Sequence, residues 1–393
     1  MQPTSLPTMS VGETLVTASA IVAGDRVLRP GWMRIAQGRI VALGAGEAPA
    51  HDGPLLEFDD ETVVPGFVDL HVHGGGGASY TGGLAEEVAT ASAFHREHGT
   101  TTTITSTVSA PPEELLDIVG RLATLVEAGV SAGIHLEGPW ISHQRCGAHD
   151  PHALRSPDPD EVARVLEAGR GTIAMVTLAP ELPGGMEAVS RFAEAGVLVA
   201  VGHTDATYDQ AREAIDRGAR VATHLFNAMT PLGHREPGPV LALLEDPRVL
   251  IELIGDGVHL HPALVHELQV STGFDRIALV TDAMAAAGMD DGPYRLGSLD
   301  VDVVDGVARL REGGAIAGST ATMELLCHRA ADSLRGPDGV VADDALVGVA
   351  QMTAGNQARV LGRTDVGVLE VGRRADFVAL DADFRVAYVH CER

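Results

Sequence analysis

The segment FVDLHVHG, residues 67–74, decides the fold, because an apolar run of β type ends there in two histidines. Residues two apart on a strand point to the same side, so His71 and His73 are expected to face one site. Seven similar runs follow, separated by amphipathic segments. The eight predicted strands are Phe67–His71, Thr101–Thr107, Gly133–Glu137, Ile173–Ala179, Val197–His203, Val221–Phe226, Leu250–Asp256 and Ile277–Asp282. Eight strands alternating with helices predict an α/β fold, a parallel (β/α)₈ TIM-like barrel.

The segment between the second and third runs illustrates the helical spacing. Ser109 is the predicted N-cap, Pro111 and Pro112 suit the first helical turn, and Gly129 is the predicted stop. The apolar positions recur at helical intervals, at Leu115, Ile118, Val119, Leu122 and Val126. The alternative fold is a doubly wound open sheet. It favours a glycine-rich phosphate loop after the first strand, and the sequence has no such pattern there.

The two ends of the chain differ from this middle part. Residues 13 to 60 and the tail from residue 367 carry alternating or β-branched stretches separated by glycine and proline. We therefore predict that both termini meet in a small β-sandwich domain, formed by residues 1–62 and 362–393. The catalytic barrel is predicted to span residues 63–361.

Composition limits the possible partners and the compartment. The 393 residues carry a net charge of −26, which disfavours binding to nucleic acid or to an anionic membrane. No apolar run reaches the roughly 18 residues of a membrane span, and the first residues lack the features of a signal peptide. Three scattered cysteines, Cys146, Cys327 and Cys391, are typical of a reducing compartment. We expect a cytoplasmic protein.

Histidines and carboxylates recur where the apolar runs end. These residues are His71 and His73 on the first run, Glu137 on the third, His203 on the fifth, His224 on the sixth and Asp282 on the eighth. Barrel enzymes place their sites at the carboxyl ends of the strands, so these side chains are expected to converge. Imidazole and carboxylate groups are ligands of Zn²⁺, Fe²⁺ and similar ions.

Each of these residues taken alone has an ordinary explanation. A single histidine at a strand end is usually a hydrogen-bonded structural residue, and a single carboxylate there is usually a helix cap. The repetition of the pattern at the same end of several strands is what favours a metal site over these explanations.

The motifs extend this pattern to a known family. The sequence resembles the amidohydrolase superfamily and, within it, the N-acetylglucosamine-6-phosphate deacetylases. The resemblance rests on PGFVDLHVHGGGG, HLEGPW, GAHDP, VTLAPE, GHTDAT, THLFNAM, GDGVHLHP, VTDAM, AGST, NQARVLG and GRRADFVALD, and it covers nearly the whole chain.

The resemblance implies an enzyme that hydrolyses N-acetyl-D-glucosamine 6-phosphate to D-glucosamine 6-phosphate and acetate, as a homodimer in the cytoplasm. It also implies one or two divalent ions per subunit, with Zn²⁺ first and Fe²⁺, Mn²⁺, Co²⁺ or Cd²⁺ as alternatives. Many binuclear amidohydrolases bridge their metals with a carboxylated lysine, but this chain contains no lysine. Glu137 is the implied substitute. The predicted sets are His71, His73, Glu137 and Asp282 for one ion and Glu137, His203 and His224 for the other.

The remaining roles also follow from the resemblance. Asp282 is the expected catalytic acid and base, and His149 would polarise the acetyl carbonyl or contact the sugar. Arg235 is expected to capture the phosphate, because its guanidinium offers a bidentate fork, and the resemblance implies that this arginine can come from the neighbouring subunit. Further predicted substrate contacts are Ala148, Asn227, Ala228, His259, Ile316, Ala317 and Gly318.

Two alternative functions remain open at this point. One is another amidohydrolase, dihydroorotase-like or deaminase-like, acting on a cyclic amide or another N-acyl amino sugar. The other is a barrel scaffold that has lost its metal and its activity. HLEGPW, the missing lysine and Arg235 disfavour the first, and the complete set of predicted ligands disfavours the second.

Overall fold

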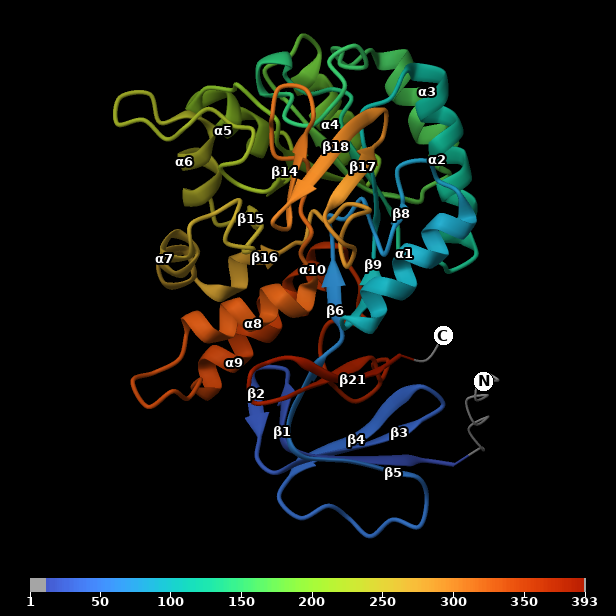
Figure 1. The fold of residues 1–393 in the computed structure, drawn as a ribbon, viewed down its shortest axis with the longest axis vertical. Helices are drawn as coiled ribbons and strands as arrows, with labels where there is room; N and C mark the ends of the chain where they lie inside the picture. The colour runs from blue at the N-terminus through green and yellow to red at the C-terminus, as the bar shows by residue number, and fades with distance from the viewer. Residues whose placement is uncertain (1–11, 392–393) are drawn as a thin grey trace.

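The computed structural model describes residues 12–391, and its central feature is a barrel of parallel strands (Figure 1). Residues 1–11, over which a signal peptide was not expected, lie outside this range. All eight predicted runs contain a barrel strand, so the predicted fold class is confirmed. The strands are β6 (Phe67–Asp69), β9 (Thr100–Thr103) continued by β10 (Thr105–Thr107), β11 (Ile134–Glu137), β12 (Ile173–Leu178), β13 (Leu198–Val201), β14 (Ala219–Ala222), β15 (Leu250–Leu253) and β16 (Ile277–Leu279).

Hydrogen bonds close the barrel between its first and last strands. β10 to β16 pair in sequence order, and β6 pairs in parallel with β9. Beyond β16, the Asp282 N–H donates to the carbonyl of His71 over 2.8 Å, and Val72 forms a parallel bridge with Ala283. This pairing brings the predicted metal ligands of the first and eighth strands, His71 and Asp282, side by side.

Helices cover the outside of the barrel. They are α1 (Ala85–Glu97), α2 (Pro112–Glu127), α3 (Pro159–Gly169), α4 (Gly185–Glu194), α5 (Tyr208–Asp216), α6 (Gly238–Glu245), α7 (Pro262–Thr272) and α8 (Met323–Ser333), followed by α9 (Asp343–Ala350) and α10 (Asn356–Val360). The predicted helix corresponds to α2, and Gly129 lies just beyond its end with φ of +75°. The predicted cap was wrong. Pro111 occupies the N-cap position, and the Ser109 side chain contacts His149 instead.

Strands from both ends of the chain form the small β domain at the lower end of Figure 1. Its strands are β1 (Thr14–Ala23), β2 (Arg26–Leu28), β3 (Gly31–Ala36), β4 (Arg39–Ala45), β5 (Leu55–Pro65), β20 (Phe377–Leu380) and β21 (Val386–His390). They are linked in the order β21–β20–β5–β1–β3–β4, with β2 beside β1, so the two ends meet as predicted. A separate core, which includes Val16, Met33 and Phe377, lies within this domain.

The connection between the two parts is short. β5 crosses the predicted boundary at residue 62 and is separated from β6 by Gly66 alone. A Cβ atom on Gly66 would collide with the side chain of Thr101, which explains the glycine at this position. The boundaries at residues 62 and 361 stay a prediction.

One sheet outside the barrel was not predicted. Between β16 and α8, the chain forms an antiparallel sheet of β17 (Gly292–Leu296), β18 (Leu299–Val304) and β19 (Val307–Leu310). Figure 1 places β17 and β18 on the side of the barrel away from the small β domain, the side toward which β6 points. This sheet has a small core with Met284, Ala286 and Ala317 and brings Leu296 to the site described below.

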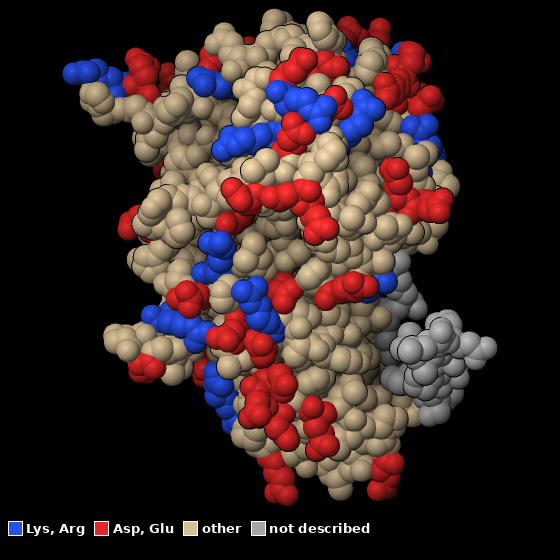
Figure 2. Space-filling view, in the orientation of Figure 1, with Lys and Arg blue, Asp and Glu red and all other residues tan. Residues whose placement is uncertain are grey.

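The surface carries the charge expected from composition. On the face seen in Figure 2, acidic side chains are spread from the barrel to the small β domain, and arginines occur in small groups among them. Among the described residues, no helix has the length and apolar character needed to cross a membrane.

Candidate metal centre and substrate pocket

The six predicted ligands meet just beyond the carboxyl ends of their strands. His203, His224 and Asp282 all have positive φ, at +48°, +28° and +48°. Residues other than glycine rarely adopt this conformation, and it usually persists only where surrounding structure enforces it. Strained backbone at three predicted ligands is typical of a functional site.

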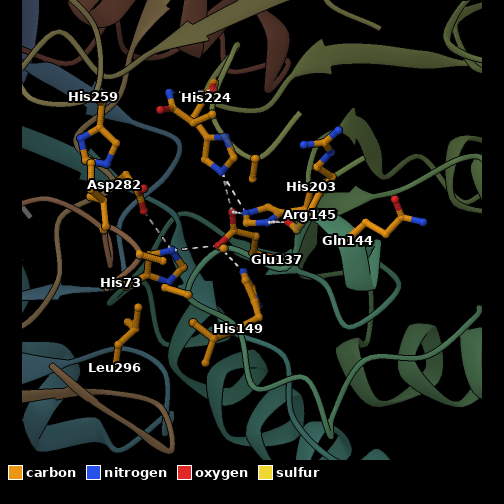
Figure 3. Close-up of a pocket in the computed structure, with 18 residues that line it drawn as sticks. His73, Glu137, Gln144, Arg145, His149, His203, His224, His259, Asp282 and Leu296 are labelled. Atoms are coloured by element: carbon orange, nitrogen blue, oxygen red, sulfur yellow. Dashed lines mark hydrogen bonds and ion pairs between the residues drawn. The ribbon is translucent and has the colours of Figure 1, made fainter. Parts of the chain in front are cut away.

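Glu137 lies at the centre of the group, as Figure 3 shows. Its Oε1 atom is 3.0 Å from Nε2 of His224 and 3.1 Å from Nε2 of His203. Its Oε2 atom is 3.1 Å from Nε2 of His73 and 3.3 Å from Nε2 of His149. Oε1 is also 3.3 Å from Nε2 of His71, so the two carboxylate oxygens lie among all four predicted histidine ligands, which is the position that a bridging ligand requires.

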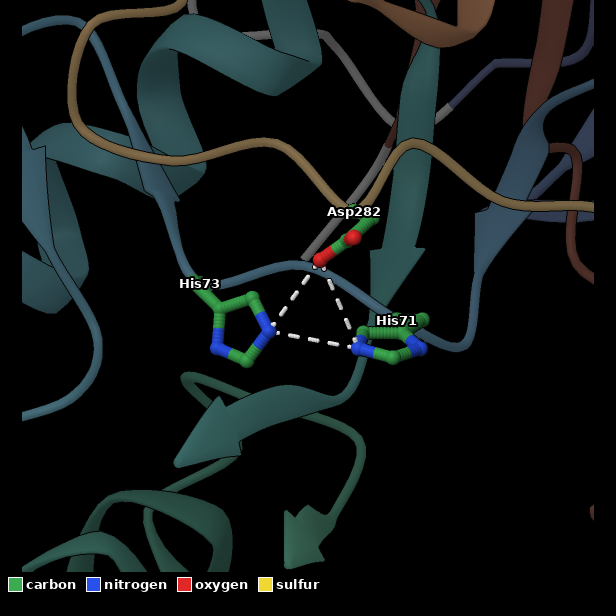
Figure 4. A group of neighbouring side chains, drawn as sticks. All are labelled: His71, His73 and Asp282. Carbon is green, nitrogen blue, oxygen red and sulfur yellow. Dashed lines mark hydrogen bonds and ion pairs between the residues drawn. The ribbon is translucent and has the colours of Figure 1, made fainter. Parts of the chain in front are cut away.

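His71, His73 and Asp282 form a second compact group (Figure 4). The two Nε2 atoms are 3.2 Å apart, and Oδ1 of Asp282 is 3.2 Å from that of His73 and 3.5 Å from that of His71. Tetrahedral ligands about 2.0–2.1 Å from one Zn²⁺ lie about 3.3–3.4 Å from one another. The spacing in this group fits one ion.

A hydrogen bond on the far side of the His203 imidazole indicates that a cation belongs between His203 and Glu137. His203 Nδ1 lies 2.8 Å from the backbone carbonyl of Arg145, which can only accept, so Nδ1 carries the hydrogen. A neutral His203 then presents the lone pair of Nε2 to the carboxylate of Glu137. Two lone pairs facing each other at this distance need a positive charge between them. This donor set therefore fits a divalent metal ion.

The charge balance leads to the same conclusion. Four buried carboxylates, those of Asp69, Glu137, Glu252 and Asp282, surround the group. None of them forms an ion pair with an arginine within the described part of the chain. Buried carboxylates are costly unless positive charge compensates them. Divalent ions would supply that charge.

The pKa shifts reflect this demand for positive charge. Burial alone would lower the pKa of His71, but the negative charges of Glu137 and Asp282 raise it well above its ordinary value. Burial alone would raise the pKa of Glu137, but the charge of His71 and hydrogen bonds from neighbouring histidines hold it well below its ordinary value. A proton on His71 thus takes the place that a metal ion would fill.

His149 differs from the other histidines in its hydrogen bonds. The backbone N–H of Ser109 donates to Nδ1 over 3.1 Å, so the ring hydrogen belongs on Nε2, which points toward Glu137. Burial lowers the pKa of His149 to about 4, so the ring is neutral near pH 7. His149 is therefore a hydrogen-bond donor into the pocket, which suits contact with an acyl oxygen better than metal ligation.

A pocket of about 330 Å³ opens over the group. Seven predicted substrate-contacting residues line it, namely Ala148, His149, Asn227, Ala228, His259, Ile316 and Gly318. Two do not. Ala317 is fully buried in the core beneath β17–β19, and Arg235 is exposed in the loop before α6, which projects from the barrel in Figure 1.

Some residues of the site escaped sequence reasoning. Gln144 and Arg145 line the pocket from the loop after β11, and Arg145 is held by an ion pair of 2.8 Å with Asp205. Arg145 could have been found in the sequence, because it is a positively charged residue between two predicted site residues, Glu137 and His149. Glu252 lies behind His71, and its place in the apolar run of β15 concealed it.

Comparisons with known proteins agree with this geometry. The model of the amidohydrolase family matches residues 62–391. The chain is 36% identical over 370 residues to N-acetylgalactosamine-6-phosphate deacetylase of Escherichia coli O157:H7, covering 91% of this chain and 94% of that protein. It is 33% identical over 354 residues to N-acetylglucosamine-6-phosphate deacetylase of Lysinibacillus sphaericus, covering 89% and 88%.

A solved structure is more similar still. It is that of a mutant N-acetyl-D-glucosamine-6-phosphate deacetylase from Mycobacterium smegmatis in complex with N-acetyl-D-glucosamine 6-phosphate. The sequences are 51% identical, the TM-score is 0.92, and the match covers 97% of this chain and 98% of that one.

Proposed function

The chain belongs to the amidohydrolase family, and we propose that it hydrolyses N-acetyl-D-glucosamine 6-phosphate to D-glucosamine 6-phosphate and acetate. The observation that carries this proposal is the meeting of four histidines, Glu137 and Asp282 beneath one pocket. The 51% identity to a deacetylase solved with this sugar phosphate supports the substrate. A scaffold without activity would not need to keep this costly group of buried charges.

We propose two divalent ions per subunit, with Zn²⁺ the first candidate and Fe²⁺, Mn²⁺, Co²⁺ or Cd²⁺ as alternatives. His71, His73, Glu137 and Asp282 would hold one ion, and Glu137, His203 and His224 the other. The compact group of His71, His73 and Asp282 supports the first set, and the contacts of Glu137 Oε1 with His203 and His224 support the second. A bound divalent ion would supply the Lewis acidity that activates water near neutral pH and polarises an amide carbonyl.

The side chains of the chain itself divide the remaining work. Asp282 would accept the proton of the attacking water and later donate it to the leaving amine, because its carboxylate faces the pocket. The Nε2–H of His149, set by the N–H of Ser109, would donate to the acetyl oxygen as negative charge develops there. His259 lines the pocket and is paired with Asp256 over 2.8 Å, which raises the pKa of His259 against the effect of burial and favours its protonated form beside an anionic substrate.

An epimer of this sugar, N-acetylgalactosamine 6-phosphate, is a second candidate substrate. The 36% identity to an N-acetylgalactosamine-6-phosphate deacetylase favours a test of N-acetylgalactosamine 6-phosphate as well. The two sugars differ at a single hydroxyl group, so the ratio of their kcat/KM values decides between them.

The direct test measures acetate release from both sugar phosphates, with and without a metal chelator. We expect release from at least one of them, its loss on chelation and its recovery when Zn²⁺ is restored. Metal analysis of the fully loaded protein should give two ions per chain. One ion would reject the two-metal form, and absence of acetate from a loaded protein would reject the deacetylase itself. Turnover of cyclic amides or amino-purines instead would favour the alternative amidohydrolases.

We further propose that the protein is a cytoplasmic homodimer and that Arg235 reaches the phosphate in the neighbouring subunit's pocket. The exposure of Arg235 and its absence from the pocket of its own chain support a role across an interface. A phosphorylated sugar substrate fits an enzyme inside the cell.

Replacing Arg235 with alanine should raise KM for the phosphorylated sugar by about 10–100-fold, the range expected for a lost hydrogen bond to a charged group. KM for the unphosphorylated sugar should stay unchanged, because that sugar offers no phosphate. Arg217→Ala removes an exposed arginine that pairs with Glu213 and serves as the control. Equal effects on both sugars would contradict the assignment.

Mixing two impaired chains tests the interface. In a dimer of an Arg235→Ala chain and an Asp282→Asn chain, one site would receive both an intact Asp282 and an intact Arg235 from the other chain. Recovery of low KM in the mixture supports the proposal. A mixture that only sums the activities of its parts contradicts it.

A further inference from the structure

We propose that Glu252 orients His71 for metal binding and joins the two halves of the site, an inference that rests on the proposed two-metal function. Its Oε2 atom lies 3.3 Å from Nδ1 of His71, on the side of the ring opposite the shared site. The same oxygen accepts the backbone N–H of His224 over 3.2 Å. One carboxylate oxygen therefore contacts a predicted ligand of each ion.

The position of Glu252 within its strand makes this placement costly. On β15, Ile251 and Leu253 pack in the main core around the barrel, while Leu250 and Ile254 belong to a separate cluster with Ala200 and Val221. Glu252 points to the same side as Leu250 and Ile254 by strand alternation. Its side chain is fully buried, and Oε1 has no hydrogen-bond partner. An apolar residue would suit this position unless the carboxylate had a function.

The function follows from which nitrogen of His71 holds the hydrogen. Oε2 of Glu252 already accepts the N–H of His224, and as an acceptor toward His71 it favours the form of His71 with the hydrogen on Nδ1. Nε2 is then left bare toward Glu137 and Asp282, 3.3 Å and 3.5 Å away. A carboxylate behind a ligating imidazole fixes its orientation and makes it a stronger ligand. Glu252 thus prepares His71 for the ion predicted at His71, His73, Glu137 and Asp282.

The contact with His224 gives the same carboxylate a second effect. His224 has φ of +28°, and its ring stacks on that of His71 with centroids 5.3 Å apart. The N–H bond to Glu252 holds this unusual backbone in place. A change at Glu252 is therefore expected to affect the His71 ion strongly and the ion at His203 and His224 less.

The test titrates metal-free protein with Zn²⁺ against a chromophoric chelator, so that affinity is measured without any activity assay. Glu252→Gln keeps the size of the side chain and an acceptor oxygen but removes the carboxylate. Glu252→Met removes the carboxylate and the acceptor oxygen together. We expect one of the two Zn²⁺ equivalents to weaken by about 10–100-fold, more for methionine than for glutamine. The other equivalent should change less.

Asp69→Asn is the matched control. Asp69 is an equally buried carboxylate that accepts the backbone N–H of His71 over 3.2 Å and the hydroxyl of Thr281, but it does not contact the imidazole. We expect its variant to keep both Zn²⁺ affinities within about threefold, below the loss typical of an orienting partner. Equal losses in Asp69→Asn and Glu252→Gln would overturn the proposal, because contact with the imidazole of His71 would then not be needed to explain them. Unchanged affinities in both Glu252 variants would also overturn it.

The ring of His71 gives a readout that does not depend on the number of ions. In ¹⁵N-histidine-labelled, metal-free protein at high pH, the His71 signals, assigned by their loss in His71→Asn, report which nitrogen carries the hydrogen. We expect Nδ1–H in the native chain and a shift toward Nε2–H in Glu252→Met. If the native chain binds a single ion, the two-metal function fails, and this spectrum alone decides the role of Glu252. Identical spectra would overturn it.

Discussion

Asp282→Asn should fold and bind metal but lose about 10²–10⁴-fold in kcat, the range that a general acid–base group contributes. The asparagine keeps the shape of the side chain and one oxygen atom, but it cannot accept the proton of the attacking water. In the native chain, His71 and His73 lower the pKa of Asp282 against the opposing effect of burial, so the side chain is ionised near pH 7, which is the form that can accept a proton. The measurements are steady-state acetate release and metal content.

Because the proton transfer occurs only in the transition state, kcat and kcat/KM should fall by the same factor. Asp302→Asn, on β18 in a surface ion pair with Arg311, removes a carboxylate away from the pocket lining and should leave both values unchanged. Near-native turnover in a metal-loaded Asp282→Asn protein would refute the assigned role.

Glu137→Gln should have the second large effect, a large loss of metal affinity. Oε2 of Glu137 faces His73, and Oε1 faces His203 and His224, so a glutamine loses the ligand oxygen on one side of the group. The substitution also removes the charge that would offset the ions. We expect metal affinity to fall by more than about 100-fold at one site at least, beyond the effect of an indirect partner. Activity should fall with it.

Glu181→Gln provides the comparison. Glu181 is a partly buried carboxylate after β12. It accepts hydrogen bonds from the hydroxyl of Thr204 and the N–H of Asp205, the two residues that follow His203 in sequence. Its variant should retain both ions. A Glu137→Gln protein that still binds two ions tightly would show that Glu137 does not bridge them.

The barrel could be predicted because its strands are buried on both sides and therefore appear as continuous apolar runs. β17–β19 were missed because their exposed strands alternate apolar and polar residues, at a place where the barrel rhythm predicts a helix. The N-cap was misassigned to Ser109 because a serine near a helix start is typical of a cap. Nothing local in the sequence shows that His149, forty positions later, takes its hydrogen bond.

The site divides in the same way. Histidines at strand ends could be found because strand direction alone brings them together. Glu252 could not, because its partner His71 lies 181 positions away in sequence, and Arg145 was overlooked although it lies between two predicted site residues. The opposite holds for Arg235. The sequence motif around it was recognised, but within a single chain Arg235 does not line the pocket.

The short passage from β5 through Gly66 to β6 has a consequence for how the protein can be divided. The chain that leaves the sheet of the small β domain reaches His71 within six residues of Pro65. Unfolding of that domain would therefore pull directly on a predicted metal ligand. Amide hydrogen exchange should report β5 and β6 opening together rather than as two cooperative units. The small β domain could then not be replaced as an independent module. A chimera that takes this domain from a relative would have to preserve the continuous passage from β5 to β6.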